Sequence, residues 1–571
     1  MSKEIPNMSN HSRRQSLYYA YLCTNVSYDI INFDETIEET LYQSNNKQTM
    51  NKTVRTLLGL LTIGLVALTS CKKENQEPKQ NEGTTYVSVA INLQSSLRAG
   101  TGTTDDEFNP KGTWNGKDAI ETIAVYVVGD GSVSYGQYTK ADFKIDKATD
   151  DTNITIKPNK AILTKPGTKK VYALINAPEE ITKTLEKSMP AHFNEAYAKA
   201  VENMTTAQVA RANAANEDLI MMSNAAECEV NIEDGVTKEE AIQGTKNLAK
   251  VSVKRVVARV ILTTTKDSYD IKLQDGTVLG TISNITYAVA QGEKAFYISQ
   301  QKDKAGSIIT PGYKFLPAVN PADKSKLTNY EEQAKVYDYS DLHSTVTTPR
   351  AAIVADNLTA ALEIGKKSLE SSAFIFEASH KFGETGQTIA DYSGDFRRGN
   401  TPYVLVRAKF TPNDNAFYND YQKNMFKRGD GTFYRGEDGL LYARNKPFKS
   451  KRTNEIVPEQ KYTEYKAGKV LYHVFVNPDN ILKTLDAPAY RNNIYHISVT
   501  GFKTLGLNWN PLYPEDPDTP DQKNPDPKPK DDPNTPPYVP GDFNTPKETY
   551  LAVEVNVIPW NVHSYNIELG L

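Results

Sequence analysis

Apolar and polar residues alternate over many short stretches of this chain of 571 residues. Seven stretches rich in β-branched and aromatic residues predict strands: 120–128, 170–176, 251–264, 282–290, 403–410, 470–476 and 493–500. An Ala-rich stretch at 191–219 and a shorter one near 355–369 are helical in character. Strands interrupted irregularly by a few helices favour a mainly β fold made of β-sandwich domains over a doubly wound sheet. We expect a domain boundary near Lys266.

The C-terminal end carries the clearest strand pattern. Leu551, Val553, Val555 and Val557 alternate with Ala, Glu and Asn residues, so one face is apolar. The preceding segment, 511–547, is so rich in Pro and Asp that it predicts an extended tether that is neither helix nor sheet ladder. Pro559 cannot donate to a central ladder, which divides the end into 550–558 and 560–571. The apolar positions of the second piece are Trp560, Val562, Tyr565, Ile567 and Leu569.

A stretch near the other end repeats this order of residue types. The chain reads YVSVAINL from Tyr86 and YLAVEVNV from Tyr550. The positions that define the first copy are Tyr86, Val87, Val89, Ile91 and Leu93. Two strands with one pattern fit one set of pockets, provided that only one is present at a time. The alternative is that any two amphipathic strands resemble each other.

The residues after the first copy suggest how it is removed. The polar run that follows Leu97 is typical of an exposed, cleavable loop. A protease that cuts between Arg98 and Ala99 would detach the strand. Taken alone, a basic residue before a Gly-rich loop is an ordinary loop residue, and it is the matching C-terminal strand that favours cleavage.

The start of the chain resembles a bacterial lipoprotein signal. Residues 1–49 form a polar, Asn-rich extension that we expect to lie upstream of the true start at Met50. A basic region and a short apolar core follow within 50–70, and the sequence LTSC ends in Cys71. We expect cleavage before Cys71 and lipidation (palmitate) of its thiol. The absence of Asp just after Cys71 favours outer-membrane sorting. The alternative is a chance cysteine after a cleavable signal.

Composition and scattered residues exclude several function classes. The net charge of −4 offers no general attraction to nucleic acid. With three cysteines, of which Cys23 and Cys71 precede the mature body, Cys228 cannot form an internal disulfide and is expected to be packed. His473 and His496 lie in amphipathic strands, where we expect structural roles, and no histidine lies in a recognised catalytic motif. We therefore predict no enzyme, no cofactor and no metal, although sequence alone leaves a glycosidase-like carboxylate pair open.

Several strings resemble one family, the major subunits of short (minor) fimbriae in Bacteroidales, or type V pilins. They are the lipobox, Arg98, KVSVKRVVARV, AVAQGEKAFYIS, RGNTPYVLVRAKFTP, RNNIYHISV, LGLNWNPLYPEDPDTP and VEVNVIPWNVHSYNIEL. The similarity begins near Met50 and departs at 1–49 and, more loosely, across 331–399. The resemblance implies two transthyretin-like β-sandwich domains, at 99–266 and 267–571, and a propeptide at 71–98. It also implies a lipidated precursor, cleavage by an Arg-specific surface protease and polymerisation by donor-strand exchange.

A subunit that loses its first strand and also donates its last one is expected to repeat along a stalk. Such head-to-tail contacts do not close, so they form filaments. The expected partners are identical subunits, tip and anchor subunits, the protease and host or bacterial surface ligands, in adhesion, biofilm formation and virulence. The rival interpretations are a surface glycan-binding lipoprotein of a nutrient-uptake system, which would stay uncut and monomeric, and a lipid-anchored hydrolase.

Overall fold

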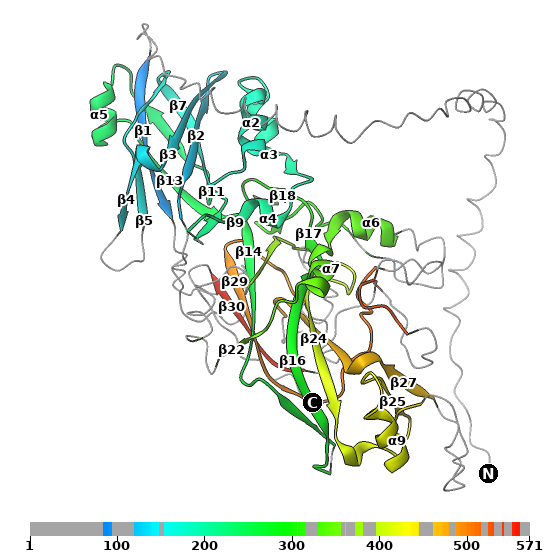
Figure 1. Ribbon diagram of the computed structural model, residues 1–571. Coiled ribbons are helices and arrows are strands. Elements are labelled where there is room, and N and C mark those ends of the chain that lie inside the picture. Colours follow the sequence, from blue (N-terminus) through cyan, green and yellow to red (C-terminus); the bar gives the residue numbers. More distant parts are fainter. Residues whose placement is uncertain are drawn as a thin grey trace, which may run out of the picture. The chain divides into compact units, whose positions relative to one another are not determined.

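The computed structural model describes residues 84–93, 119–147, 154–215, 217–273, 275–304, 306–315, 317, 329–355, 360, 372–380, 396–444, 461–478, 486–514, 524–529, 540–541 and 551–559. The chain divides into two units, Met1–Glu77 and Pro78–Leu571, and every described residue belongs to the second. Strands dominate these residues (Figure 1), which confirms the prediction of a mainly β fold. None of the helices that the structure describes is long and apolar enough to cross a membrane.

The first part of the chain forms one sheet, the N-terminal sheet, which folds back on itself. Its strands pair in the order β3 (Ser132–Thr139), β2 (Thr122–Gly129), β7 (Gly167–Ile175), β11 (Met222–Asn224), β13 (Leu248–Arg255), β1 (Thr85–Leu93), β5 (Ile154–Pro158) and β4 (Phe143–Lys147), with β12 (Glu229–Ile232) on β7 and β6 (Ile162–Thr164) on β1. The edge strand β3 returns to β6, where Ser134 Oγ donates a hydrogen bond of 3.0 Å to Thr164 Oγ1. The sheet thereby encloses one apolar core, to which most of its strands contribute Val and Ile side chains.

The C-terminal sandwich consists of two facing sheets. One pairs in the order β21 (Tyr337–Asp338), β17 (Gly292–Glu293), β23 (Ala373–Phe376), β14 (Val257–Thr264), β29 (Asn493–Phe502) and β30 (Leu551–Pro559), with β22 (Ile353–Val354) on β14. The other pairs in the order β15 (Tyr269–Lys272), β16 (Val278–Ala290), β24 (Tyr403–Pro412) and β28 (Lys469–Phe475). Val260, Leu262, Val404, Val406 and Ile497 are among the buried side chains that fill the space between them. That the two β regions are transthyretin-like stays a prediction.

Short elements complete the described structure. The remaining strands are β8 (Ala200–Val201), β9 (Ala210–Ala212), β10 (Asp218–Ile220), β18 (Phe296–Tyr297), β19 (Gln301–Lys302), β20 (Ile308–Ile309), β25 (Phe433–Gly436), β26 (Leu441–Tyr442) and β27 (Tyr462–Tyr465). The α-helices are α2 (Glu179–Ser188), α3 (Phe193–Ala198), α4 (Thr206–Val209), α5 (Lys238–Gln243), α6 (Asn329–Val336), α7 (Ser340–Thr347) and α9 (Asp420–Phe426). Three short 3₁₀ turns are η1 (Lys140–Asp142), η4 (Asp414–Ala416) and η5 (Lys466–Gly468).

All seven predicted strands are strands in the structure, but two expectations fail. The stretch 251–264 holds two strands of different sheets, since β13 ends at Arg255 and β14 begins at Val257. The helix expected at 191–219 is wrong for most of its length, because only α3 and α4 are helical and β9 pairs with β10 in the remainder. Alanine favours helix only weakly, and pairing with β10 outweighs that preference. Most of the helix expected near 355–369 lies outside the described residues.

The change from one sheet to the other occurs at Val256. Val256 and Val257 belong to an apolar cluster that also contains Leu185 and Phe193 from the helices of the first part and Ile494 from β29. Burial of this cluster joins the N-terminal sheet to the C-terminal sandwich through apolar contacts. The domain division expected near Lys266 stays a prediction.

Candidate functional site

The strand β1 occupies a central position in the N-terminal sheet, hydrogen-bonded along both edges (Figure 1). On one side β13 runs parallel to it, with Cα partners from Ser88 and Leu248 to Leu93 and Val253. On the other side β6 pairs antiparallel with residues 85–87 and β5 with residues 91–93. A strand that entered this position from outside would have to break both ladders. We call the position of β1 between these neighbours the slot.

One face of β1 forms part of the apolar core of the N-terminal sheet. Val87, Val89 and Ile91 are 0%, 2% and 0% exposed and contact residues of the facing strands. Burial of an aliphatic side chain contributes roughly 1.5–3 kcal/mol, so these three together contribute roughly 5–9 kcal/mol. Leu93 is partly buried against the same core, and Tyr86 is half-buried. The residues that the sequence predicted for the removable strand are thus brought together along one slot.

Two residues hold the beginning of β1, and we call Val236 and Asn247 the clamp. Thr85 Oγ1 accepts hydrogen bonds from the Val236 N–H at 3.0 Å and from Asn247 Nδ2 at 3.2 Å. Asn247 Nδ2 also donates to the Tyr86 carbonyl at 2.9 Å, and the Tyr86 N–H donates to the Val236 carbonyl at 3.2 Å. Thr85 is 0% exposed and Val236 is 1% exposed, so water does not reach these groups. The clamp therefore holds Thr85 and Tyr86 of β1 by buried hydrogen bonds.

The backbone of Asn247 explains why an asparagine stands in the clamp. Its φ is +48°, a left-handed conformation that Asn adopts more readily than most residues. Its side chain is held in place because Oδ1 accepts the Glu233 N–H at 2.8 Å and Nδ2 donates to the Glu233 carbonyl at 3.0 Å. The side chain is therefore oriented toward β1 by contacts that do not depend on β1.

The covalent connection from β1 to the rest of the sheet passes through residues 94–118, which lie outside the described residues. The predicted cleavage residues Arg98 and Ala99 fall in this segment, and the predicted lipid site Cys71 also lies outside the described residues. Because the next described element is β2, a cut in this segment would leave β1 attached only by hydrogen bonds and apolar contacts.

The C-terminal strand β30 pairs with its own chain. It runs antiparallel to β29, from Asn493 opposite Pro559 to Phe502 opposite Leu551, with a register shift between Val499 and Gly501. In the pairing order of its sheet β30 is the last strand, so its second edge has no neighbour among the described residues. The predicted donor positions Leu551, Val553, Val555 and Val557 lie in this strand, whereas Trp560, Val562, Tyr565, Ile567 and Leu569 lie outside the described residues.

The described parts of the Pro/Asp-rich segment, 511–514, 524–529 and 540–541, contact the sandwich, and the extended tether expected for 511–547 stays a prediction. Leu512 is 2% exposed, and Asp526 is also 2% exposed. The Asp526 carboxylate accepts from Arg407 Nε at 2.8 Å and from Lys469 Nζ at 2.9 Å. Pro540 contributes its carbonyl to a hydrogen bond of 2.9 Å from the Gly399 N–H. Proline lacks an N–H donor, but carboxylates and carbonyls remain acceptors, and they bind this segment to the sandwich.

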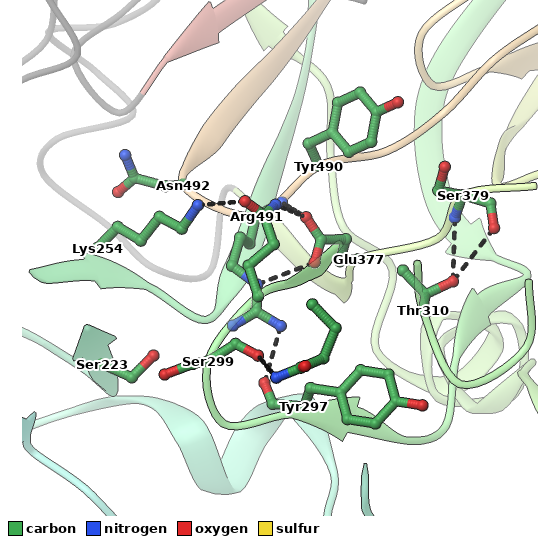
Figure 2. Close-up of polar contacts among 12 residues, drawn as sticks. Ser223, Lys254, Tyr297, Ser299, Thr310, Glu377, Ser379, Tyr490, Arg491 and Asn492 are labelled. Atoms are coloured by element: carbon green, nitrogen blue, oxygen red, sulfur yellow. Dashed lines mark hydrogen bonds and ion pairs between the residues drawn. The ribbon is translucent and has the colours of Figure 1, made fainter. Parts of the chain in front are cut away.

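A buried polar network, which we call the brace, reaches the end of β13 at Lys254 (Figure 2). Arg491 Nε donates to Glu377 Oε2 at 3.0 Å, and the side chains of this pair are 1% and 2% exposed. Arg491 also donates to the carbonyls of Ile298 at 3.0 Å and Tyr297 at 2.8 Å. Gln300 donates to Glu377 and accepts from Lys254, which lies in β13. The strand that forms one wall of the slot is thus linked by hydrogen bonds to loops of the C-terminal sandwich.

Two carboxylates line a cavity in the described part of the chain. A cavity of about 620 Å³ is lined by Glu293 and Asp341 among others, but Asp341 pairs with Arg350 at 2.7 Å. Glu293 accepts hydrogen bonds from Thr310 and from the Gly312 N–H, and burial raises its pKa to about 8. Both carboxylates are therefore occupied by structural partners. No cluster of His, Cys, Asp and Glu within the part of the chain that the structure describes could hold a metal ion.

The histidine and cysteine expectations can be checked directly. His473 is 5% exposed and His496 is 2% exposed, and burial lowers the pKa of His496 to about 3, so it is neutral. Its Nε2 lies 2.8 Å from Thr263 Oγ1. Cys228 is partly buried against the core of the N-terminal sheet, and burial raises the pKa of its thiol. All three are packed side chains, as the sequence predicted.

Comparison with known proteins finds fimbrial subunits, both by family model and by sequence identity. Residues 463–566 match the family model described as major fimbrial subunit protein type IV, fimbrillin, C-terminal. Two relatives, both named minor fimbrium subunit Mfa1 from Porphyromonas gingivalis, are each 30% identical in an alignment of 549 residues that covers 89% of this chain and 98% of the relative.

Two solved structures of fimbrial proteins from the same organism are also similar in part. The tip fimbrial protein Mfa3, with a C-terminal truncation, is 10% identical with a TM-score of 0.29, over 74% of this chain and 95% of Mfa3. The fimbrial anchor protein Mfa2 is 10% identical with a TM-score of 0.22, over 57% of this chain and 77% of Mfa2.

Proposed function

Because the chain belongs to the minor fimbrium subunit family of the Bacteroidales fimbrillins, we propose that it is a stalk subunit that polymerises by exchanging a terminal strand between copies. The chain is a structural subunit of a cell-surface fimbria and not an enzyme, since its relatives are fimbrial subunits. A role in adhesion accompanies fimbriae of this family. The further steps below, from export to strand exchange, are parts of the proposal.

The observation that carries the proposal is the position of β1. This strand fills a central slot, contributes three fully buried aliphatic side chains to the core, and continues into the segment that contains Arg98. A cut between Arg98 and Ala99 converts β1 into a separate peptide, residues 71–98, that is held without a covalent link. Its departure would expose apolar surface and two unpaired strand edges, on β13 and on β5 with β6. An empty slot of this kind favours occupation by another strand.

The occupant in our proposal is the C-terminal strand of another copy. Leu551, Val553 and Val555 repeat the alternation of Val87, Val89 and Ile91. In the described structure β30 is bound to β29 of its own chain, on one edge only. Release of β30 costs one ladder, and insertion into the slot gains two, so exchange is favoured once β1 has left.

The distance that the strand can cover is set by the last bound part of the tail. Pro540 and Gly541 lie against the sandwich, and residues 542–550 separate them from β30. Fully extended, this connection spans at most roughly 30 Å. That length permits donation to an adjoining copy but not to a distant one. Donation from tail to slot is heterologous and does not close, so the product is a filament.

The proposal includes the steps before and after exchange. The precursor is exported as a lipoprotein modified at Cys71 and processed by an Arg-specific protease at the outer membrane. As the resemblance to short fimbriae implies, we also propose that this subunit assembles with tip and anchor subunits of its own fimbria. Adhesion to host or bacterial surfaces and support of biofilm formation and virulence follow from that location.

The decisive experiment uses the chain from Cys71 to Leu571. Treatment with an Arg-specific protease should create a new N-terminus at Ala99, release the 71–98 peptide and produce SDS-resistant ladders. Two controls separate the steps: Arg98→Gln should stay uncut and monomeric, and deletion of 550–571 should permit cutting without ladders. Clean cutting at Arg98 by a folded protein that remains monomeric would overturn the proposal and favour a surface glycan-binding lipoprotein.

A further inference from the structure

We propose that the clamp, Val236 and Asn247, together with Lys250 on β13, sets the register of the incoming strand by recognising Thr549 and Glu554 of the next subunit. This inference rests on the proposed strand exchange and specifies which residues of the tail enter which positions of the slot. It assigns a positioning role to the Val236 backbone and to the Asn247 and Lys250 side chains.

The first argument is the chemistry that β1 offers to the clamp. Thr85 Oγ1 accepts hydrogen bonds from the Val236 N–H and from Asn247 Nδ2. The next backbone carbonyl, of Tyr86, accepts from the same Asn247 amide. When β1 leaves, the clamp loses these acceptors inside a site that is buried in the uncut chain. Buried donors without partners are costly, so a replacement strand that supplies a hydroxyl at the position of Thr85 is favoured.

The tail contains two places where a hydroxyl residue precedes a tyrosine, as Thr85 precedes Tyr86. These are Thr549 before Tyr550 and Ser564 before Tyr565. In β1 the hydroxyl lies on the same face as the buried aliphatic residues, because positions 85, 87, 89 and 91 share one parity.

Parity separates the two tail candidates. After Thr549, the residues of the same parity are Leu551, Val553 and Val555, which are all aliphatic. After Ser564 they are Asn566, Glu568 and Gly570, which are not. Only the strand that begins at Thr549 presents both the hydroxyl for the clamp and the aliphatic residues for the core. The occupant of the slot is therefore 549–557 of a second copy.

The same register produces a charge pair on the other face. In the uncut chain Ala90 is 5% exposed, and its Cα partner on β13 is Lys250, whose side chain is exposed. Alignment of Thr549 with Thr85 puts Glu554 at the position of Ala90, next to Lys250. Opposite charges on neighbouring strands attract, whereas Ala90 offers Lys250 no charge. The incoming strand thus gains a contact that the resident strand lacks.

The experiment compares polymers of full chains from Cys71 to Leu571, cut with an Arg-specific protease. Each contact between neighbouring copies, here called a junction, contains the slot of one copy and the tail of the other. A chain that carries one substitution in its slot and one in its tail therefore brings the two together at every junction. Thr549→Val keeps the shape and removes the hydroxyl, and it should weaken the junction about tenfold, measured as the critical concentration for ladder formation. Asn247→Ala should weaken it similarly, and the double variant should add little beyond either single change. Thr549→Ser should restore wild-type assembly.

Charge exchange tests the register independently of the clamp. Lys250→Glu and Glu554→Lys should each raise the critical concentration about threefold, and the two changes together should return it toward the wild-type value. Ser564→Ala is the matched control for Thr549→Val and should leave assembly unchanged. Thermal melting of the uncut chains identifies any variant that fails to fold, and the changes at 549 and 554 leave the slot itself intact.

The outcomes distinguish this inference from the proposed function on which it rests. If the cut wild-type chain forms no ladders, the strand exchange itself is wrong. If wild-type ladders form but Thr549→Val has no effect, if Ser564→Ala weakens them instead, or if the charge exchange shows no recovery, exchange stands and the assigned register is overturned.

Discussion

The two ends of the described chain are both strands, but they are held in different ways. β1 pairs on both edges, places three side chains in a closed core and is fastened by the clamp. β30 pairs on one edge, with a register shift in its ladder. Two strands of similar sequence are thus held with unequal strength in one chain, so β1, which is held more firmly, needs a covalent cut before it can leave in the proposed assembly. Position in the sheet, more than the residues of the strand, sets this difference.

This difference accounts for the need for proteolysis in the proposed assembly. A free tail cannot compete with β1 as long as β1 is covalently attached, because the resident strand is at a very high effective concentration. After a cut the resident peptide dissociates into dilute solution and loses this advantage. The tail, which gives up only one ladder, then enters.

The largest expected effect concerns the brace, which links the slot wall to the sandwich that holds β30. Arg491→Met leaves Glu377 buried without its ion-pair partner, and we expect a loss of about 3–5 kcal/mol in the free energy of unfolding. Urea unfolding of the uncut chain measures it. The matched control is Arg350→Met at a less buried ion pair, which should cost less. If amide hydrogen exchange of Arg491→Met stays as slow as in the wild type, in both the N-terminal sheet and the C-terminal sandwich, each region is stable without the brace and the prediction is wrong.

A direct comparison of the two strands comes next. In the uncut chain Ile91→Ala should destabilise by about 2–5 kcal/mol because it creates a cavity in the core, and Val555→Ala should cost less. In the cut polymer the order should reverse, since β1 has left and Val555 now fills the slot. Urea unfolding gives the first comparison and the critical concentration the second. A polymer weakened by Ile91→Ala would mean that β1 stays in place.

A smaller effect is expected from Thr85→Val. The change removes the hydroxyl that the Val236 N–H and Asn247 bind, which should cost about 1–3 kcal/mol in the uncut chain. The cut 71–98 peptide should also leave faster, measured by loss of the peptide from a gel-filtered complex. Thr155→Val, which removes a hydroxyl at the other end of β1 where it donates to Asn92, should have a weaker effect. If the 71–98 peptide leaves at the same rate from Thr85→Val and from Thr155→Val, the clamp does not hold β1 more firmly than other polar contacts do.

An effect of pH on stability is expected in the C-terminal sandwich, where His496 lies. Burial lowers the pKa of His496 from 6.5 to about 3. Between these two pH values the unfolded chain is protonated at His496 and the folded chain is not. Stability is then full above pH 6.5 and falls as the pH drops toward 3, by roughly 2 kcal/mol at pH 5. His496→Gln should flatten this dependence in urea titrations from pH 7 to pH 5.

The strands could be predicted because alternation of β-branched residues depends on local sequence. The break at Val256 could not, since an uninterrupted run such as VSVKRVVARV gives no sign that the sheet changes within it. The predicted helix at 191–219 failed because β9 and β10 pair across a turn in which Asn213 Oδ1 accepts the Glu217 N–H at 2.9 Å.

The candidate site was predictable in outline and not in its polar details. The slot strand was recognised because its pattern recurs at 550–557. The clamp was missed, since neither the left-handed φ of Asn247 nor its proximity to Thr85, 162 residues earlier, is visible in the sequence. The buried Asp526 was missed for a similar reason, because its partners Arg407 and Lys469 lie far away in the chain. Side chains whose role depends on distant partners need the folded structure.

The brace has a mechanical consequence for a filament built in this way. Tension would enter each subunit at the slot, beside β13, and leave it through the tail beyond Asp526. Between these points the load passes from the N-terminal sheet to the C-terminal sandwich at Val256. There the peptide chain that joins β13 to β14 is supported by the apolar cluster and by the Glu377–Arg491 pair. A shaft of such subunits would stretch little at its joints, and the junctions between copies, loaded in shear along paired strands, would determine the force at which it breaks.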